Sequence, residues 1–216
     1  MTTDSKALAA YKEEIAKELA NVSSTLTTGG GDIIKCKMKT FTLPDGTNSQ
    51  DPIQVVVVAY SNNNAYFSTP YNQNNPTPPD CKAKGSVIED LKPDASSTDA
   101  QTDGLCKDCA NNQWGSSPNG GNGKACTQSV MLAVVPSTAD ADTAPMLFKV
   151  PATTMKAWGN YVLKLAGMGI TTTQMITEIS FNPAVDYNNF LFRAIEPVKD
   201  LGVFMGLKAE ANAILK

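Results

Sequence analysis

Five cysteines carry the clearest chemical signal in this 216-residue chain. Cys106 and Cys109 form a C-x2-C pair, which lets two thiolates grip one tetrahedral ion from a tight turn. Cys81 is separated from the pair by 24 residues and Cys126 by 16, and both lie where apolar sequence meets polar loop. Four thiolates satisfy Zn²⁺ completely, so the sequence predicts a structural zinc held by Cys81, Cys106, Cys109 and Cys126.

Other uses of these cysteines stay open. A C-x2-C pair can be a redox pair, although two further cysteines and the lack of a flanking strand-to-helix pattern favour a metal. An iron–sulfur cluster also takes four cysteines, and spacing alone does not separate it from zinc. A catalytic zinc is disfavoured, because the chain has no histidine and four cysteines leave no position for water. The fifth cysteine, Cys36, is interpreted as a core residue.

The remaining sequence offers little catalytic machinery. The absence of histidine removes Ser-His-Asp and Cys-His nucleophilic sites. Glu178, Asp186 and Glu196 are the only carboxylate candidates, and no pair of them shares a predicted face. The glycine-rich run 115–124 is not a phosphate loop, because Pro118 stands where that motif needs glycine, and we interpret it as a flexible link. The sequence therefore predicts a protein that is not an enzyme.

Composition limits the partners of the chain. Hydrophobic residues make up 42% and charged residues 18%, which suffices for one buried core. Eighteen basic and 21 acidic residues give a net charge of -3, so any nucleic-acid surface must be a local patch. The chain begins without the apolar core of a signal peptide and has no apolar run of ~18 residues. We expect a cytoplasmic protein that does not contact membranes.

The elements that must position the cysteines follow from periodicity. We expect one domain over 1–216, with an N-terminal helix and glycine-rich link at 1–30 and a last helix at 198–216. Residues 53–60 predict a strand buried on both faces, followed by a turn at 62–64 and a short strand near Tyr66. Further strands are expected at 130–135, 146–150, 175–181 and 189–195, and a helix at 153–165.

The stretch 76–127 differs in composition from the rest. It is rich in Asn, Pro, Asp, Ser and Gly and cannot bury much apolar surface, so a bound metal would supply its folding energy. The predicted fold is α+β, a mostly antiparallel sheet or OB-like barrel with flanking helices and a four-cysteine zinc insertion.

One family resemblance rests on these residues. Cys106-Lys-Asp-Cys-Ala-Asn-Asn-Gln-Trp114-Gly-Ser116, followed by Gly123-Lys124-Ala-Cys126, resembles a zinc-cysteine core of phage and prophage proteins, and Pro78-Pro79-Asp80-Cys81 fits the same pattern. The resemblance covers chiefly 76–135 and extends more weakly to 148–156. Such proteins are similar in size and strand content to phage single-stranded-DNA-binding proteins, which implies a role in DNA replication or recombination in the host cytoplasm.

Basic and aromatic residues alternate near the predicted strands. In 33–43, Ile34, Cys36, Met38 and Thr40 are expected on a buried face, and the opposite, basic face is expected to carry Lys35, Lys37, Lys39 and Phe41. Single-strand binders combine cations for phosphates with flat rings for bases. The same lysines could instead solubilise a sheet edge, and the rings could be core residues. The candidate nucleic-acid-binding residues are Lys35, Lys37, Lys39, Phe41, Tyr60, Tyr66, Phe67, Tyr71, Lys107 and Lys124.

These observations predict a sequence-independent binder of single-stranded nucleic acid, DNA in the first place with RNA left open. A homo-oligomer is compatible with the pattern. The alternative is a structural or assembly protein, a virion or filament subunit stabilised by a structural zinc. A protein that stays oligomeric in high salt and ignores DNA would support that alternative.

Overall fold

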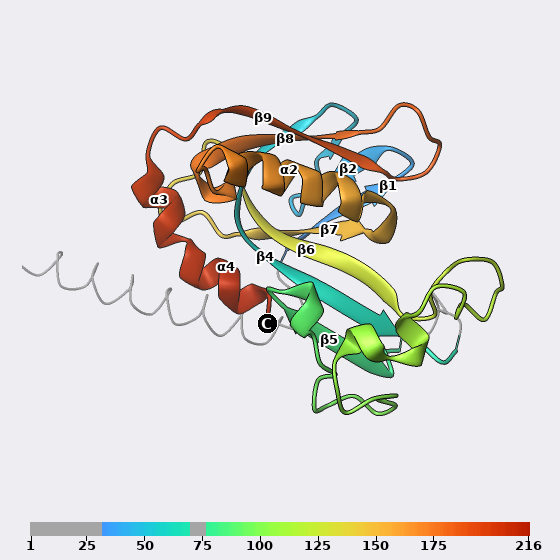
Figure 1. Ribbon diagram of the computed structural model, residues 1–216. Coiled ribbons are helices and arrows are strands. Elements are labelled where there is room, and N and C mark those ends of the chain that lie inside the picture. Colours follow the sequence, from blue (N-terminus) through green and yellow to red (C-terminus); the bar gives the residue numbers. More distant parts are fainter. Residues whose placement is uncertain (1–31, 70–76) are drawn as a thin grey trace, which may run out of the picture. The chain divides into compact units, whose positions relative to one another are not determined.

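The structure is a computed structural model that describes residues 32–69 and 77–216 (Figure 1). The predicted helix at 1–30 and the candidate Tyr71 lie outside these residues. Residues Asp32–Lys216 form one unit of the α+β class. Its strands are β1 Ile33–Lys37, β2 Thr40–Thr42, β3 Asn48–Ser49, β4 Ile53–Tyr66, β5 Cys81–Gly85, β6 Thr127–Pro136, β7 Met146–Pro151, β8 Met175–Phe181 and β9 Phe190–Pro197. Its helices are α2 Met155–Gly167, α3 Leu201–Gly206 and α4 Lys208–Ile214.

The strands form one mixed sheet in the order β3-β2-β1-β7-β6-β4-β8-β9, with β5 also pairing β4. Every pairing is antiparallel except that of β1 with β7. Strand β4 is shared along its length: residues 53–56 pair with β8, and residues 62–66 pair with β5. The sheet curls into a half-barrel, which is compatible with an OB-like fold.

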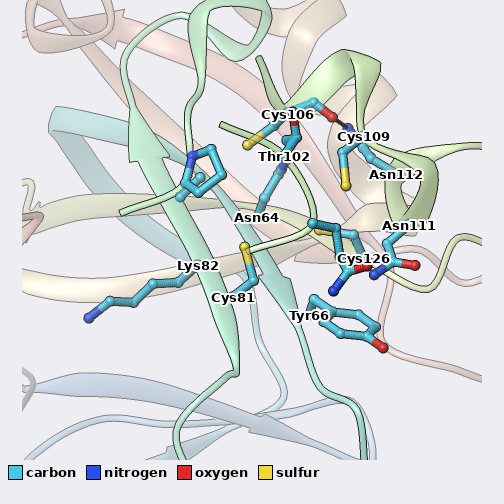
Figure 2. A pocket seen from close by; sticks show the side chains of 13 residues that line it. Asn64, Tyr66, Cys81, Lys82, Thr102, Cys106, Cys109, Asn111, Asn112 and Cys126 are labelled. Carbon is cyan, nitrogen blue, oxygen red and sulfur yellow. Dashed lines mark hydrogen bonds between the residues drawn. The ribbon is translucent and has the colours of Figure 1, made fainter. Parts of the chain in front are cut away.

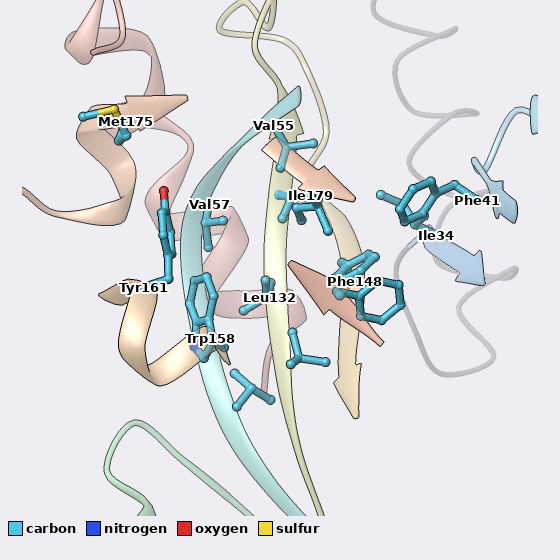
Figure 3. Close-up of a cluster of buried hydrophobic side chains, with 14 of the residues drawn as sticks. Ile34, Phe41, Val55, Val57, Leu132, Phe148, Trp158, Tyr161, Met175 and Ile179 are labelled. Carbon is cyan, nitrogen blue, oxygen red and sulfur yellow. The ribbon is translucent and has the colours of Figure 1, made fainter. Parts of the chain in front are cut away.

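The centre of the sheet is buried on both faces, as the valine run of β4 predicts. Val55 and Val57 point into a first core, which α2 covers with Trp158 and Leu165 (Figure 3). The alternate valines of β4 point into a second core on the opposite face. Helices α3 and α4 cover that core with Phe204, Leu207, Ala211 and Leu215. The half-barrel therefore has hydrophobic packing of its own, independent of the polar stretch 77–126.

The asparagine run in β4 does not form a turn, so that prediction is wrong. Asn62, Asn63 and Asn64 continue the strand and pair with β6 on one side and β5 on the other. The Asn62 side chain also donates from Nδ2 to the Ser86 carbonyl at 2.8 Å. Backbone pairing on both edges outweighs the preference of asparagine for turns. The extension carries β4 from the core of the half-barrel to the cysteines.

The predicted single strand at 33–43 is a hairpin. Met38 and Lys39 have φ of 49° and 54° and form a two-residue turn between β1 and β2. The turn reverses the chain, so Cys36 lies opposite Phe41 and both side chains face the first core. Phe41 is 0% exposed and packs against Phe148, Phe181 and Phe190. Its predicted place on the basic face is therefore wrong.

The C-terminal segment begins later than predicted and is divided. It starts at Leu201, where the Asp200 carboxylate accepts a hydrogen bond from the Gly202 N–H at 3.0 Å, and it breaks between α3 and α4 at Leu207. The predicted strand pair at 175–181 and 189–195 is present as β8 and β9. Within 32–69 and 77–216, no helix has the length and apolar character needed to cross a membrane.

Candidate metal centre and nucleic-acid surface

Two of the four predicted ligands are fixed by the sheet. Cys81 is the first residue of β5 and pairs with Tyr66 at the end of β4. Cys126 directly precedes β6, whose first residue, Thr127, pairs with Ala65 on the other edge of β4. The end of β4 therefore holds these two cysteines on either side of itself. Both lie at strand borders, as the sequence indicated.

The C-x2-C pair forms a compact knuckle. Residues Cys106–Asp108 make one 3-10 turn, in which the Cys109 N–H donates to the Cys106 carbonyl at 3.2 Å. Backbone hydrogen bonds tie this region to its surroundings: the Cys106 N–H donates to the Leu91 carbonyl, and the Cys126 N–H donates to the Asn111 carbonyl, both at 2.7 Å. The Asn112 amide adds a buried bond to the Cys106 carbonyl at 2.8 Å. The knuckle is thus positioned against both outer cysteines.

All four cysteines line one small cavity (Figure 2). The thiol groups of Cys81, Cys106 and Cys109 point toward its middle. Its volume of about 20 Å³ is room for a single atom of the size of a water oxygen, which needs ~10–15 Å³. Asn64, Tyr66, Asn111 and Asn112 complete the wall. The structure therefore brings together the set that the spacing predicts and leaves space for one ion.

Burial and neighbouring thiols favour the neutral form of Cys106 and Cys126 in the absence of a cation. Burial raises the pKa of Cys126 to about 12, and the nearby thiols of Cys106, Cys109 and Cys81 add to the rise, whereas Lys124 lowers it. Burial also raises the pKa of Cys106, reinforced by Cys81 and Cys109 and opposed by Asn64. Four neighbouring thiolates repel one another in a site of low polarity. The positive charge of a divalent ion offsets that repulsion, so a thiol that coordinates the ion loses its proton.

Asn64 is the one side chain with unpartnered buried atoms in the described part of the chain. It is 3% exposed, and neither its Nδ2 nor its Oδ1 meets hydrogen-bond geometry with a described residue. Leaving an amide buried and unpaired costs about 1–3 kcal/mol. The side chain lines the cysteine cavity together with Cys106.

The donor set, the cavity and Asn64 fit a thiolate-bound metal ion. As the side chains stand, however, no three Cys, Asp or Glu groups among the described residues are arranged to hold one. The thiols line the cavity without converging to ligand spacing. Binding an ion would therefore require the thiol groups to move closer together.

Residues 77–126, between β4 and β6, are called the excursion below. Little apolar packing holds them together. The core of the excursion consists of Ala83, Leu91 and Cys106, with Ile88 packed against it. Leu91 packs so closely over Gly85 that a Cβ there would stand 2.8 Å from its Cδ2 atom. The glycine-rich loop is not a free link, because the N–H groups of Gly115 and Ser117 both donate to the Gly123 carbonyl. Short polar contacts, rather than hydrophobic area, shape this part.

Two of the predicted lysines, Lys35 and Lys37, share an exposed face of the sheet with Lys149, which was not among the predicted residues. Ile34 and Cys36 face the first core, so Lys35 and Lys37 project from the opposite face of β1 and are exposed. Lys149 of β7 is exposed on that face too, since Phe148 and Val150 beside it point into the first core. The register Ile34↔Phe148 places Lys35 and Lys149 at adjacent positions of neighbouring strands. Lys35, Lys37 and Lys149 are called the lysine face below.

The predicted aromatic residues do not lie on that face. Tyr60 packs edge-on against Trp158 in the first core, and Tyr66 lines the cysteine cavity. Phe41 is in the core, as described above. Phe67 is 36% exposed beyond the end of β4. The aromatic part of the predicted interface is therefore dispersed, and among its members in the described residues Phe67 alone is exposed.

The two lysines of the excursion differ in their surroundings. Lys107 is exposed on the knuckle. Lys124 is half-buried: its Nζ donates to Asn112 Oδ1 and Gln128 Oε1, both at 3.2 Å, and lies 5.1 Å from the centre of the Trp114 ring. Lys39 is half-buried beside the turn and donates its backbone N–H to Asn188 Oδ1 at 3.4 Å.

Trp114 is a surface residue of the loop that follows the knuckle. Its side chain is 78% exposed. The loop around Trp114 has no hydrophobic periodicity from which the exposure of the side chain could be predicted. The sequence shows only that Trp114 lies close to Cys109 along the chain. Among the carboxylate candidates, Glu178 is engaged by Arg193, whose Nε and Nη2 donate to it at 3.0 and 2.8 Å.

The chain matches no protein-family model and no curated protein, and its fold matches no solved structure.

Proposed function

We propose that this protein binds single-stranded nucleic acid without sequence preference and without catalysis, and that a structural zinc on Cys81, Cys106, Cys109 and Cys126 holds its excursion in place. The observation that carries the proposal is the lysine face. Three exposed cations on adjacent strands, in a chain of net charge -3, form a local surface for phosphates. DNA is the first candidate because of the resemblance to phage proteins, with a role in replication or recombination.

The lysine face is suited to binding the phosphate backbone of a nucleic acid. Lysine contacts phosphate as a point charge and reads no base, so binding through it is indifferent to sequence. Neither β1 nor β7 contains an acidic residue to compete with a phosphate. Each phosphate contact on a single strand changes the slope of log affinity against log salt by ~0.7, so three contacts predict a slope contribution of about -2.

The zinc has a structural task in this proposal. When bound, it would supply the cohesion that the small excursion core lacks, by joining the knuckle to the two cysteines beside β4. Four cysteine ligands leave no position for a reacting water, so the ion would not act on the nucleic acid.

Fluorescence anisotropy of a labelled oligothymidylate tests the proposal, with oligouridylate and a duplex of equal length alongside. We expect salt-dependent preference for the single strands. The triple variant K35E/K37E/K149E should lose at least tenfold in affinity and about 2 from the salt slope. The matched variant K164E/K199E/K208E makes the same change in net charge at exposed positions elsewhere and should bind almost normally.

Equal losses in the two triple variants would attribute the effect to net charge and would contradict a defined lysine face. Absence of binding by the wild-type protein would overturn the proposed function. A homo-oligomer that persists in high salt without binding DNA would then favour the structural or assembly role.

A further inference from the structure

Trp114 is held in an exposed position by its own module. Its ring is 78% exposed, whereas the other tryptophan, Trp158, is 4% exposed in the core. Lys124 lies over one ring face, and two hydrogen bonds from its Nζ fix that ammonium group. The second ring face is left for another group. An exposed indole held in this way is a preformed stacking surface, which loses little conformational entropy on binding.

A groove of about 520 Å³ runs beside this ring. It is lined by Trp114, Lys124, Cys126 and Gln128, together with Thr153, just before α2, and Met155, the first residue of α2. Small-molecule sites have volumes of roughly 300–1,000 Å³, so the groove can accept a nucleoside. Its walls combine apolar atoms with a few polar groups, as sites for flat heteroaromatic rings do.

Both segments that form the groove carry only positive charge. Between Asp108 and Asp140 the only charged residue is Lys124. Between Asp142 and Glu178 the charged residues are Lys149, Lys156 and Lys164. A chain with more acids than bases thus presents this groove without a carboxylate from either segment. The charge is complementary to an anionic ligand that also has a flat apolar ring.

We propose that the groove binds one nucleotide of a single-stranded nucleic acid, with its base stacked on the open face of Trp114 and its phosphate near Lys124. This inference rests on the proposed function and supplies the base-stacking site that Phe41 and Tyr60, which pack in the first core, do not provide. A stacked base contributes roughly 5- to 100-fold to affinity, in a manner indifferent to sequence.

Tryptophan emission of the intact, metal-quantified protein tests this site, because Trp158 is shielded and Trp114 is not. Titration with oligothymidylate should quench the emission in parallel with the rise in anisotropy of a labelled strand. W114F should keep most of the affinity and lose the quenching. W114A should lose roughly 5- to 100-fold in affinity. Y187A, which removes another exposed aromatic ring, should bind like the wild-type protein.

The outcomes separate the two proposals. Wild-type binding with unchanged affinity in W114A would overturn the Trp114 site and leave the lysine face standing. Absence of wild-type binding would overturn both. Equal zinc content in W114A and the wild-type protein shows that the variant keeps its module, so that a loss of affinity in W114A reports the missing ring.

Discussion

Cys81 pairs with Tyr66 at the last register position between β5 and β4. On the other edge of β4, Thr127 pairs with Ala65, which brings Cys126 to the same end of the strand. The hydrogen bonds of the sheet therefore position two of the predicted ligands, Cys81 and Cys126, without help from a metal ion. The knuckle reaches them through a segment with a much smaller core of its own. The excursion should consequently unfold locally at a lower free energy than the sheet.

Metal removal should loosen residues 77–126 and spare the half-barrel. The sheet has two hydrophobic cores, whereas the excursion has a small one, so a chelator should speed amide exchange in the excursion by roughly 100-fold or more. Hydrogen-exchange mass spectrometry measures this, with the valines of β4 as the internal reference. C106S should behave like the chelated protein, and C36A should not. Equal exchange in the excursion with and without chelator would contradict the structural role.

Asn64→Leu should have opposite effects on the chelated and the metal-loaded protein. In the chelated protein it removes an unpaired buried amide, so unfolding should cost about 1–3 kcal/mol more. In the loaded protein the Asn64 amide would support the Cys106 thiolate, and its loss should weaken zinc binding roughly 10- to 100-fold. Asn63→Leu, on the opposite face of β4, is the control for zinc affinity. Unchanged zinc affinity in Asn64→Leu would show that the amide does not support the ligand.

The β1–β2 turn should be open to stabilisation. Met38 and Lys39 both occupy left-handed backbone conformations that cost non-glycine residues about 1–2 kcal/mol each. Asn-Gly is the preferred pair for such a turn, so Met38→Asn with Lys39→Gly should raise the free energy of unfolding by about 1–2 kcal/mol. Urea denaturation measures this. Gly46→Ala, which puts a side chain at a φ of 86°, should act in the other direction. A destabilised Asn-Gly variant would refute the hairpin geometry.

Cys36 should react slowly with alkylating agents and should make stability depend on alkaline pH. Burial raises its pKa from 9.0 to about 12. Because the folded pKa exceeds the unfolded one, its contribution is complete below about pH 9 and declines as pH rises toward 12. Iodoacetamide mapping at pH 8 should show Cys36 modified roughly 1,000-fold more slowly than in the unfolded chain. C36A should lose less stability than wild type between pH 9 and 10.5. Rapid labelling of Cys36 in the folded protein would contradict the burial.

The grouping of four cysteines around one cavity could be predicted from their spacing in the sequence. The C-x2-C pair defines the knuckle. The outer cysteines, Cys81 and Cys126, mark the ends of β5 and β6, which both pair with β4. The two-faced burial of β4 could be predicted as well, since four consecutive valines suit a strand with a core on each side.

The hairpin at Met38 could not be predicted, because neither turn residue is glycine or asparagine. Without that signal, the alternation through 33–43 indicates one strand and places Thr40 and Phe41, which follow the turn, on the wrong faces. The prediction of a turn at 62–64 is wrong for the opposite reason. The turn preference of asparagine is present, but pairing with β5 and β6, which lie further along the chain, overrides it. Trp114 lies in a loop whose exposure depends on tertiary structure alone.

If four cysteines hold one metal ion, native mass spectrometry of the purified protein will detect it. We expect a mass excess equal to one zinc ion under native conditions, absent after acid denaturation, retained in C36A and lost in C106S. A native mass equal to that of the bare polypeptide, or an excess that C106S retains, would contradict the four-cysteine metal site.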